Sequence, residues 1–356
     1  MKILFIINAL TIGGAERLVT NLALHMKNEK HDVELLLLSN RNSSELINKI
    51  EENNIKVSIS KYTKVRDIRN YLFIKKQIKN NQYDVIHVHL FPALYYVSLL
   101  KRRILKNAKL IYTEHSTDNK RRSKKILRKI EINIYKKYDG VIAISKAVKK
   151  TLNDWLDHKV NIEIIENGIP TSDFSVKKEF RKNNKIRVGM VSRFAKSKDH
   201  LTLVRAMKYL PNYYELYFAG EGETFENVKK EVFRLGLQKK IQFKGNVVNV
   251  NGFLNECDIY VQSSNWEGFG LSVVEAMAVG LPIIASNVPG LSETVLDSGL
   301  LFEKSNVFNL VDNIRIAECN LEFYSNKAYE RSKFYDISRV GNEHLKYYKN
   351  IKDKKI

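Results

Sequence analysis

Two glutamates eight residues apart flank a glycine turn in the second half of the chain. The segment from Ser264 to Pro282 reads SNWEGFGLSVVEAMAVGLP and follows an apolar, strand-like run. Ser272 can form a capping box with Glu275, so a helix is expected to start there. The unpaired amides and positive dipole end of such a helix attract anionic groups, whereas Glu267 and Glu275 accept hydrogen bonds from hydroxyl groups. Phosphate and polyol together indicate a nucleotide sugar as the ligand.

Two cations follow another strand-like run. Arg193 and Lys198 lie five residues apart in one loop, and two cations at the end of a strand can clamp a diphosphate. Lys196 lies in the same loop, and a solvated basic loop is the alternative interpretation. Gly220 begins a Gly-Glu-Gly-Glu segment at the end of a further strand. Glycine at such a position permits close approach to a base or a ribose.

The first half of the chain carries a second glycine loop. Gly13 and Gly14 follow the strand-like run Ile3–Ile7 and open a helix, an arrangement that favours anions. A dinucleotide site is disfavoured because the G-x-G-x-x-G fingerprint is missing and because Ser39 and Asn40 stand where an acidic ribose ligand is expected. A tight strand-to-helix turn without a ligand is the alternative.

These motifs resemble the GT-B glycosyltransferases, specifically the large retaining family 4 (group 1). That family has a Glu, seven residues, Glu signature followed by a small residue, Gly and Pro, which here falls on Glu267, Glu275, Ala278, Gly280 and Pro282. The resemblance extends over nearly the whole chain and is specific for fold and reaction class, not for substrate. It implies that Glu275 binds the ribose hydroxyls and that Glu267 contacts the hydroxyls of the donor sugar.

The resemblance implies roles for the remaining motifs. Arg193 and Lys198 would hold the nucleotide diphosphate, and Gly13 and Gly14 would lie against the diphosphate and the acceptor. His115, after a strand, would lie near the point of sugar transfer. The implied catalytic residues are Glu267, His115, Arg193 and Lys198. The implied substrate-binding residues are Gly13, Gly14, Arg193, Lys198, Gly220, Glu267, Phe269, Gly270, Leu271 and Glu275. No metal and no cofactor are implied.

A His-Val-His pair lies at the end of another strand. Alternation along a strand puts His87 and His89 on the same face. A metal site needs a third and a fourth ligand, and none is evident nearby in the sequence. His87 is expected to be a polar strand end, and His89 is a candidate for the cleft.

Length and patterning predict two α/β domains. The chain has 356 residues and 44% hydrophobic content, enough for two cores. Strand-like runs alternate with helical stretches, which predicts parallel sheets with helices on both faces. The expected strands are Ile3–Ile7, Val33–Leu38, Val57–Ile59, Val85–Val88, Leu110–Tyr112, Val141–Ile144 and Ile162–Ile165, then Ile186–Val191, Glu215–Ala219, Ile241–Phe243, Ile259–Gln262, Ile283–Ala285 and Leu300–Phe302.

The expected domains are 1–176, an acceptor-side Rossmann-like domain, and 177–335, a nucleotide-sugar-binding Rossmann-like domain. The resemblance implies that they face each other across a cleft and that the C-terminal helix at 336–356 crosses back to the first domain. No run of 18 or more apolar residues occurs, so no spanning helix is expected. The two cysteines, Cys257 and Cys319, indicate no disulfide framework and fit a reducing cytoplasm.

The net charge of +21 implies attraction to polyanions, although a compositional bias towards Lys, Asn and Ile contributes to it. Residues 119–137 carry nine basic residues and one acid, with Ile126, Ile130 and Ile134 at four-residue spacing. This pattern predicts a basic amphipathic helix at a membrane surface. An ordinary surface helix is the alternative. Aromatic residues that could stack on bases are absent from 119–134, so no nucleic-acid partner is expected.

The leading hypothesis is a retaining, metal-independent glycosyltransferase. It would move a sugar from a nucleotide-diphosphate sugar, with a UDP-sugar as first choice, to a saccharide acceptor that is lipid-linked, in cell-surface polysaccharide biosynthesis. The expected location is the cytoplasm, peripheral at the inner face of the cell membrane. A non-catalytic basic Rossmann-type protein that binds anionic membrane or nucleic acid is the alternative. A nucleotide-sugar epimerase or dehydrogenase ranks third because its dinucleotide fingerprint is missing.

Overall fold

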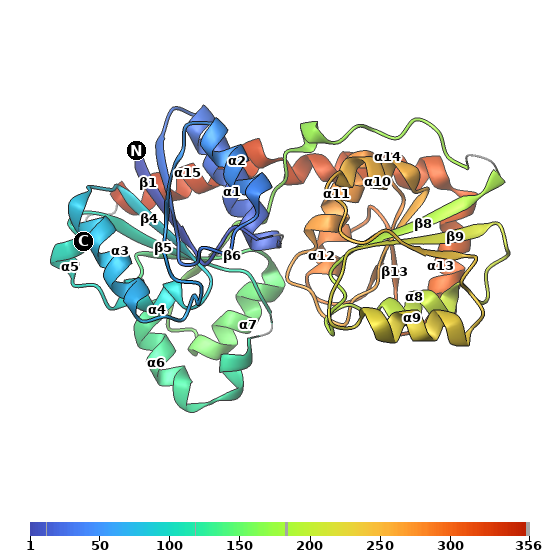
Figure 1. The fold of residues 1–356 in the computed structure, drawn as a ribbon, viewed down its shortest axis with the longest axis horizontal. Helices are drawn as coiled ribbons and strands as arrows, with labels where there is room; N and C mark the ends of the chain where they lie inside the picture. Colours follow the sequence, from blue (N-terminus) through green and yellow to red (C-terminus); the bar gives the residue numbers. More distant parts are fainter. Residues whose placement is uncertain (12, 118, 182–183, 354–356) are drawn as a thin grey trace. The chain divides into compact units, whose positions relative to one another are not determined.

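The chain folds into two compact units. The computed structural model describes residues 1–11, 13–117, 119–181 and 184–353. Unit 1 comprises Met1–Gly168 together with the C-terminal segment from Ile337, and unit 2 comprises Ile169–Asp336. Figure 1 shows each unit as a central sheet with helices on both faces.

The boundary between the units falls after Gly168, whereas the expected domain boundary followed residue 176. The intervening residues belong to unit 2 because their backbone is bonded there. The Ile169 N–H donates to the Tyr335 carbonyl at 2.9 Å, and the Lys177 N–H donates to the Val279 carbonyl at 2.8 Å. The side chain of Lys177 also ion-pairs with buried Asp258 at 3.4 Å.

Unit 1 contains a seven-stranded parallel sheet in the order β3-β2-β1-β4-β5-β6-β7. Its strands are β1 (Lys2–Ile7), β2 (Asp32–Leu37), β3 (Lys56–Ile59), β4 (Val85–His89), β5 (Lys109–Glu114), β6 (Gly140–Ala143) and β7 (Ile162–Ile164). Its helices are α1 (Gly14–Asn28), α2 (Ser44–Glu52), α3 (Arg69–Asn80), α4 (Ala93–Ser98), α5 (Arg102–Leu105), α6 (Ile126–Tyr135), α7 (Lys146–Leu156) and α15 (Ile337–Asp353).

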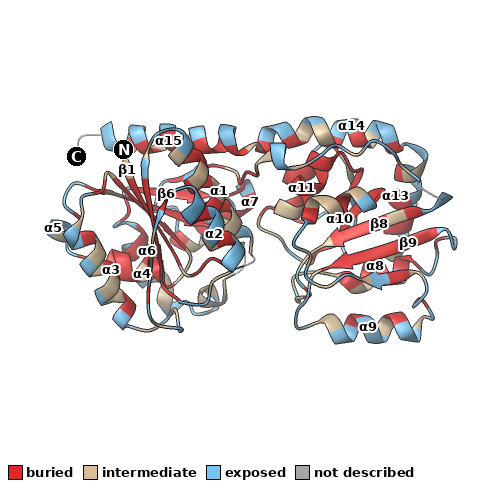
Figure 2. Cartoon of the chain, turned by 45° about the horizontal axis from the view of Figure 1, so that its top comes forward, coloured by how far each residue is buried: buried red, intermediate tan, exposed pale blue. Residues whose placement is uncertain are grey.

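One face of this sheet is covered by α1 and α15, which pack against each other (Figure 1). Leu18, Leu22 and Met26, the four-residue repeat of α1, are completely or almost completely buried. They share a core with the inward residues of β1 and with Tyr348 of α15. Strands β1 and β4 are buried along nearly their whole length because both faces of a parallel sheet are covered by helices (Figure 2).

Unit 2 contains a six-stranded parallel sheet in the order β10-β9-β8-β11-β12-β13. Its strands are β8 (Ile186–Val191), β9 (Tyr214–Ala219), β10 (Ile241–Phe243), β11 (Ile259–Gln262), β12 (Ile283–Ser286) and β13 (Leu300–Phe302). Its helices are α8 (His200–Ala206), α9 (Phe225–Arg234), α10 (Val250–Glu256), α11 (Leu271–Val279), α12 (Leu291–Val295), α13 (Val307–Cys319) and α14 (Leu321–Ser332). Two buried clusters pack on the two faces of the sheet.

Each expected strand-like run forms a strand, and the prediction of doubly wound α/β architecture is confirmed. In both units the strand order reverses beside the first strand, between β1 and β4 and between β8 and β11. Open α/β sheets bind ligands beyond the carboxyl ends of the strands at such a switch point. Within the described part of the chain, no helix combines the length and apolarity that a bilayer span requires.

The basic segment 119–137 does not form the single amphipathic helix that its composition predicts. A 3-10 turn, Lys120–Ser123, precedes α6. Arg121 ion-pairs with Glu131 at 3.1 Å, and Arg122 ion-pairs with Glu114 at 2.9 Å; the two arginine side chains are only 13% and 10% exposed. Both carboxylates are buried, and buried charges need partners. These two arginines therefore anchor the segment internally and do not belong to a surface charge patch.

Candidate functional site

The site of unit 2 is built from two loops on either side of its switch point. The loop after β8 runs from Ser192 to Asp199, and the loop after β11 runs from Ser263 to Gly270. The Asn265 N–H donates to the Ser197 carbonyl at 2.7 Å, and the Asp199 N–H donates to the Ser263 carbonyl at 3.1 Å. The hydroxyl of Ser263 returns a bond to the Asp199 carbonyl at 2.8 Å. These bonds hold the two loops in a fixed register.

That register brings Lys198 and Glu267 together. The ammonium of Lys198 donates directly to the carboxylate of Glu267, and the two side chains are 15% and 19% exposed. A cation expected to hold phosphate is thus partly neutralised by a carboxylate expected to face sugar hydroxyls. A diphosphate that approaches Lys198 must displace this carboxylate or share the ammonium with it.

The other predicted cation of the loop, Arg193, is exposed. Its position is set by its neighbours. The ring of Phe194 stacks on His200 at 4.0 Å between centroids, and His200 Nε2 lies 2.9 Å from the Ser192 hydroxyl. Burial, together with the charge of Lys198, lowers the pKa of His200 to about 3. A neutral, rigid imidazole therefore fixes the backbone on either side of Arg193.

Gly220 lets the loop after β9 touch the loop after β8. Its φ is +132°, and a Cβ there would lie 2.1 Å from the carbonyl oxygen of Ser192. Any side chain would push the two loops apart. The sequence predicts that Gly220 allows close approach to a ligand. In the structure Gly220 instead lies close to the backbone of Ser192.

The N-terminus of α11 is formed differently from the expected capping box. The helix begins at Leu271 with Gly270 as the N-cap, at φ +95°, and no side chain caps it. The hydroxyl of Ser272 instead donates to Oε1 of buried Gln262 at 3.1 Å. The capping-box prediction is therefore wrong, because a buried acceptor on β11 takes the serine hydroxyl. The first amides of α11 are left at the carboxyl edge of the sheet.

Phe269 and Glu275 flank this helix start from the buried side. Phe269 is 3% exposed and Glu275 is 5% exposed. The ring of Phe269 packs edge-on against Tyr335 at 5.2 Å, so only its backbone can serve a ligand. The pKa of the Tyr260 phenol is raised by burial and, further, by the negative charges of Glu275 and Glu267. Both glutamates of the signature therefore lie within electrostatic reach of one phenol.

Gly13, Gly14 and His115 belong to unit 1. Gly13 is the N-cap of α1 and Gly14 is its first residue. A Cβ at Gly13 would lie 2.3 Å from Oε2 of Glu16, and the hydroxyl of Thr11 donates to Oε1 of the same carboxylate at 3.2 Å. The N-terminus of α1 thus already faces a carboxylate of its own chain.

His115 follows β5 and contacts another histidine. Its Nε2 lies 2.9 Å from Nδ1 of His89. Burial and the nearby His344 lower the pKa of His115 to about 3. His89 is completely buried, and its pKa is lowered by burial and by the neighbouring histidines. The expectation of a polar strand end at His87 does not hold. His87 is also completely buried and bonds to Tyr348 at 2.6 Å and to Thr113 at 2.7 Å.

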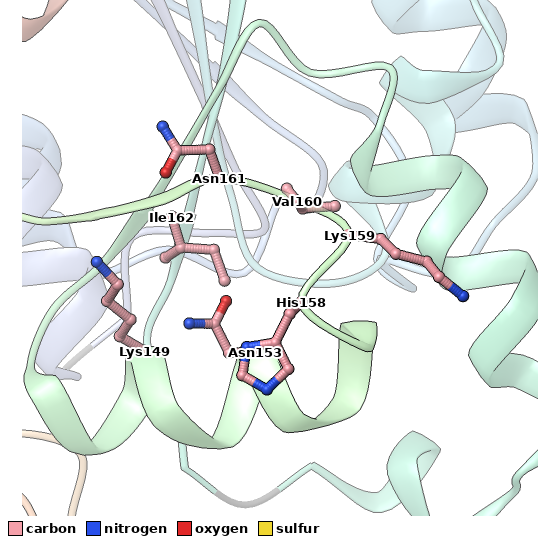
Figure 3. Close-up of a pocket in the computed structure, with 7 residues that line it drawn as sticks. All are labelled: Lys149, Asn153, His158, Lys159, Val160, Asn161 and Ile162. Atoms are coloured by element: carbon pink, nitrogen blue, oxygen red, sulfur yellow. The ribbon is translucent and has the colours of Figure 1, made fainter.

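A surface pocket of ≈ 370 Å³ lies elsewhere in unit 1 (Figure 3). Lys149 and Asn153 of α7 line it with the segment His158–Ile162, which leads into the amino end of β7. The predicted site residues lie at the carboxyl ends of strands, so this pocket does not belong to the candidate site.

Three residues that organise the site were not singled out in the sequence. Gln262 bonds to Tyr260, Ser264 and Ser272. Asp199 caps α8 through the N–H of Thr202 at 3.2 Å, and His200 supports the Arg193 loop. An Asp followed by a helical stretch is a recognisable N-cap signal, but nothing local marks Gln262 or His200.

The two halves of the chain match two families. Residues 12–173 match Glycosyltransferase Family 4, and residues 171–331 match Glycosyl transferases group 1. A Klebsiella pneumoniae protein described as an uncharacterized 41.2 kDa protein in the cps region is 29% identical over 307 residues, which are 79% of this chain and 82% of that protein.

A Campylobacter jejuni protein is 26% identical over 369 residues, 97% of this chain and 99% of its own length. It is named N-acetylgalactosamine-N,N'-diacetylbacillosaminyl-diphospho-undecaprenol 4-alpha-N-acetylgalactosaminyltransferase. The crystal structure of Anabaena HepE in complex with UDP and glucose has a similar fold, with a TM-score of 0.83 and 20% identity. The match covers 98% of this chain and 100% of that one.

Proposed function

Because the chain belongs to the GT-B glycosyltransferases of family 4 (group 1), we propose that it transfers a sugar from a UDP-sugar to a lipid-linked saccharide with retention of anomeric configuration. The observation that carries the proposal is the Lys198–Glu267 pair at the switch point of unit 2, with Arg193 in the same loop as Lys198. The pair places a lysine suited to bind phosphate next to a glutamate suited to bind sugar hydroxyls. The non-catalytic alternative has no comparable observation in its favour.

In the proposed reaction the nucleoside diphosphate leaves the anomeric carbon. Negative charge builds up on the diphosphate, and Arg193 and Lys198 stabilise it together with the first amides of α11. Once Lys198 turns to the phosphate, Glu267 is released to accept hydrogen bonds from the donor sugar. Glu275 accepts hydrogen bonds from the ribose, and the backbone of Phe269, Gly270 and Leu271 orients the sugar. Side-chain cations perform the charge neutralisation, so the proposal requires no metal.

UDP is the proposed nucleotide because the structurally similar HepE was crystallised with UDP. The test is a thermal-shift screen of UDP-, GDP- and ADP-sugars. A ligand at a hundred times its dissociation constant stabilises the folded state by about 2.7 kcal/mol. A shift with a GDP- or ADP-sugar alone would overturn the choice of base, and no shift with any nucleotide would overturn the donor site.

The acceptor is proposed to be lipid-linked because the Campylobacter relative is named for a diphospho-undecaprenol acceptor. Incubation with the donor and either a lipid-linked or a free saccharide tests this, and NMR of the product's anomeric proton tests retention. Equal rates on both acceptors would refute the lipid requirement. A product of inverted configuration would refute retention.

Docking at the inner membrane surface is proposed through α6 and the residues before it. Lys124, Lys125 and Lys129 are exposed, and Ile126 and Ile130, one helical turn apart, are 80% and 49% exposed. Lysines beside exposed isoleucines form the pattern of a helix that lies in an anionic interface. Arg121 and Arg122 are excluded from this surface because their side chains are paired inside the unit.

Liposome co-sedimentation tests the docking surface. Each lysine near an anionic bilayer contributes about 1 kcal/mol, so changing the three lysines to Ser should weaken binding on the order of a hundredfold. High salt should weaken it in the same direction. The matched control changes three exposed lysines of unit 2 to Ser, Lys229, Lys230 and Lys239. Equal losses in both triple variants would show that total charge, not this surface, drives binding.

A further inference from the structure

A buried amide lies at the carboxyl end of β11, between the parts of the candidate donor site. Gln262 is completely buried, and its side chain contacts three hydroxyl groups. The hydroxyl of Tyr260 lies 2.8 Å from Oε1, that of Ser272 donates to Oε1 at 3.1 Å, and Nε2 donates to that of Ser264 at 3.1 Å. A hydroxyl can both donate and accept, so the amide links the same three residues in either orientation.

Two of these contacts lead to the loop after β8, which carries Lys198. The hydroxyl of Tyr260 accepts the N–H of Val191 at 3.3 Å. Val191 is the last residue of β8, and the loop begins directly after it. The backbone of Ser264 pairs with that of Lys198 in an antiparallel bridge. The amide is thus linked to the base of the loop through one partner and to its far end through another.

The third contact leads to the start of α11. Ser272 is the second residue of that helix, and its hydroxyl bonds to Gln262. The proposed function assigns the first amides of α11 and the ammonium of Lys198 to the same diphosphate. One side chain therefore connects the two elements that must act together, and its bonds set the distance between them.

The stability of the sheet does not require an amide at this position. The other residues of β11, Ile259, Tyr260 and Val261, are completely buried. A buried amide costs free energy unless its groups are hydrogen-bonded, and an apolar side chain carries no such requirement. All three bonds of Gln262 are made to residues that adjoin the donor site, so the amide adds a fixed placement of these parts.

We infer that Gln262 is a positioning residue for the donor diphosphate. It holds the start of α11 and the Lys198 loop in one register, so that two linked phosphates are bound at the same time. The inference rests on the proposed function in one respect, that these two elements hold the diphosphate. The register itself is a property of the protein without ligand.

Hydrogen–deuterium exchange of the ligand-free protein tests the register. Gln262→Met keeps a side chain of similar size and removes the hydrogen bonds. The backbone amides of residues 192–199 and 271–274 should exchange faster in this variant, because both segments lose a support. Unchanged exchange in the two segments would overturn the inference.

Asn313→Leu is the matched control. Asn313 is a buried amide of α13 in unit 2, and it donates to the carbonyl of Leu301 at 3.0 Å, away from the two loops. Its loss should lower the melting temperature without faster exchange in residues 192–199 and 271–274. Equally fast exchange in both variants would show a general loss of stability and would refute the positioning role.

UMP and UDP separate placement from folding in a second measurement. UMP has one phosphate and needs no register between the two elements, whereas UDP must meet both at once. We expect Gln262→Met to weaken UDP binding roughly tenfold, as for one lost charge-assisted hydrogen bond, and to leave UMP within about threefold. The value of kcat should fall roughly 10- to 100-fold, because small displacements of positioned groups cost that much.

Ser272→Ala is a milder variant that removes one of the three bonds. It should weaken UDP binding in the unaltered background and have almost no further effect in Gln262→Met, because its partner is already lost. Additive losses would show that Ser272 does not act through Gln262 and would overturn the link to α11. This cycle also tests the link if Gln262→Met alone folds poorly, because Ser272→Ala without any loss of UDP affinity refutes it.

The outcomes distinguish this inference from the proposed function. If the unaltered protein binds UDP and Gln262→Met weakens UMP and UDP by the same factor, the positioning role is refuted and the donor site stands. If the unaltered protein does not bind UDP, the proposed donor fails. In that case hydrogen–deuterium exchange still decides whether Gln262 holds the register.

Discussion

Replacing Glu267 with Gln should tighten the binding of free UDP while slowing sugar transfer. In the ligand-free protein Lys198 is engaged by the Glu267 carboxylate. Free UDP lacks the donor sugar whose hydroxyls Glu267 is proposed to bind, so it meets the Glu267 carboxylate only as a competitor for the ammonium of Lys198. Glutamine keeps the shape and removes the charge, which leaves Lys198 available to phosphate.

The size of the gain follows from the exposure of the pair. Two unit charges about 4 Å apart interact by roughly 4 kcal/mol at an effective dielectric constant of 20, whereas fully exposed pairs are worth about 0–1 kcal/mol. With side chains 15% and 19% exposed, the pair lies between these limits. A gain of about 1–2 kcal/mol corresponds to roughly 5- to 30-fold tighter UDP. For transfer, losing a charged hydrogen-bond partner of about 1.5–3 kcal/mol lowers kcat roughly 10- to 150-fold.

Isothermal titration calorimetry with UDP measures the first effect. The control is a double-mutant cycle with Lys198→Met, in which Glu267→Gln should lose most of its gain because no ammonium is left to release. Glu275→Gln is a second control. It removes a buried carboxylate proposed to bind ribose, so it should weaken UDP binding. Unchanged or weaker UDP binding in Glu267→Gln would show that the pair does not restrain the donor site.

Three further predictions concern the supports of the site. Arg193→Ala should lower kcat about a hundredfold or more, because the leaving diphosphate loses a stabilising cation; steady-state kinetics measures this, and a change of less than about threefold would remove Arg193 from the mechanism. Gly220→Ala should lower the melting temperature and UDP affinity, because its Cβ would meet a carbonyl oxygen at 2.1 Å; Gly236→Ala, also at a positive φ (+70°) but with nothing within 4 Å, should cost far less. Lowering the pH from 7 to 5.5 should destabilise unit 1 more than unit 2, because four of its histidines are in ring contact and burial lowers the pKa of each: His87, His89, His115 and His344. Below about pH 6.5 the unfolded chain binds their protons first, so each neutral ring weakens folding by roughly 1.4 kcal/mol per pH unit. Urea unfolding followed by Trp155 fluorescence in a Trp266→Phe chain would report on unit 1, and an equal response of both units would contradict the prediction.

The sequence was sufficient for the sheets because their signals are local. Short apolar runs such as Ile3–Ile7 and Ile186–Val191 are typical of strands buried on both faces, and glycines mark the loops that follow them. The same local signals found the residues around Gly270, because a glycine turn before a helical run indicates an exposed helix start.

The pairing of Lys198 with Glu267 could not be predicted in this way. The two residues are 69 positions apart, and they meet only because β8 and β11 are neighbours in the sheet. Predictions made from neighbouring residues were also wrong where a residue distant in sequence bound the side chain. Ser272 bonds to Gln262 instead of capping its own helix, and Arg121 pairs with Glu131 instead of facing solvent.

The candidate site of unit 2 contains an ion pair, whereas the contacting histidines of unit 1, His89 and His115, are neutral. The proposed reaction gives a reason for this difference. In unit 2 the site residues Lys198 and Glu267 form an ion pair, as suits a surface on which negative charge develops when the diphosphate leaves. In unit 1 the rings of His89 and His115 lie in contact, and burial lowers the pKa of both, which favours the neutral form. A cationic imidazole beside an acceptor hydroxyl would oppose the positive charge that develops at the anomeric carbon of the donor sugar. A neutral imidazole adds no such charge, which suits the position near the point of sugar transfer that the family resemblance implies for His115.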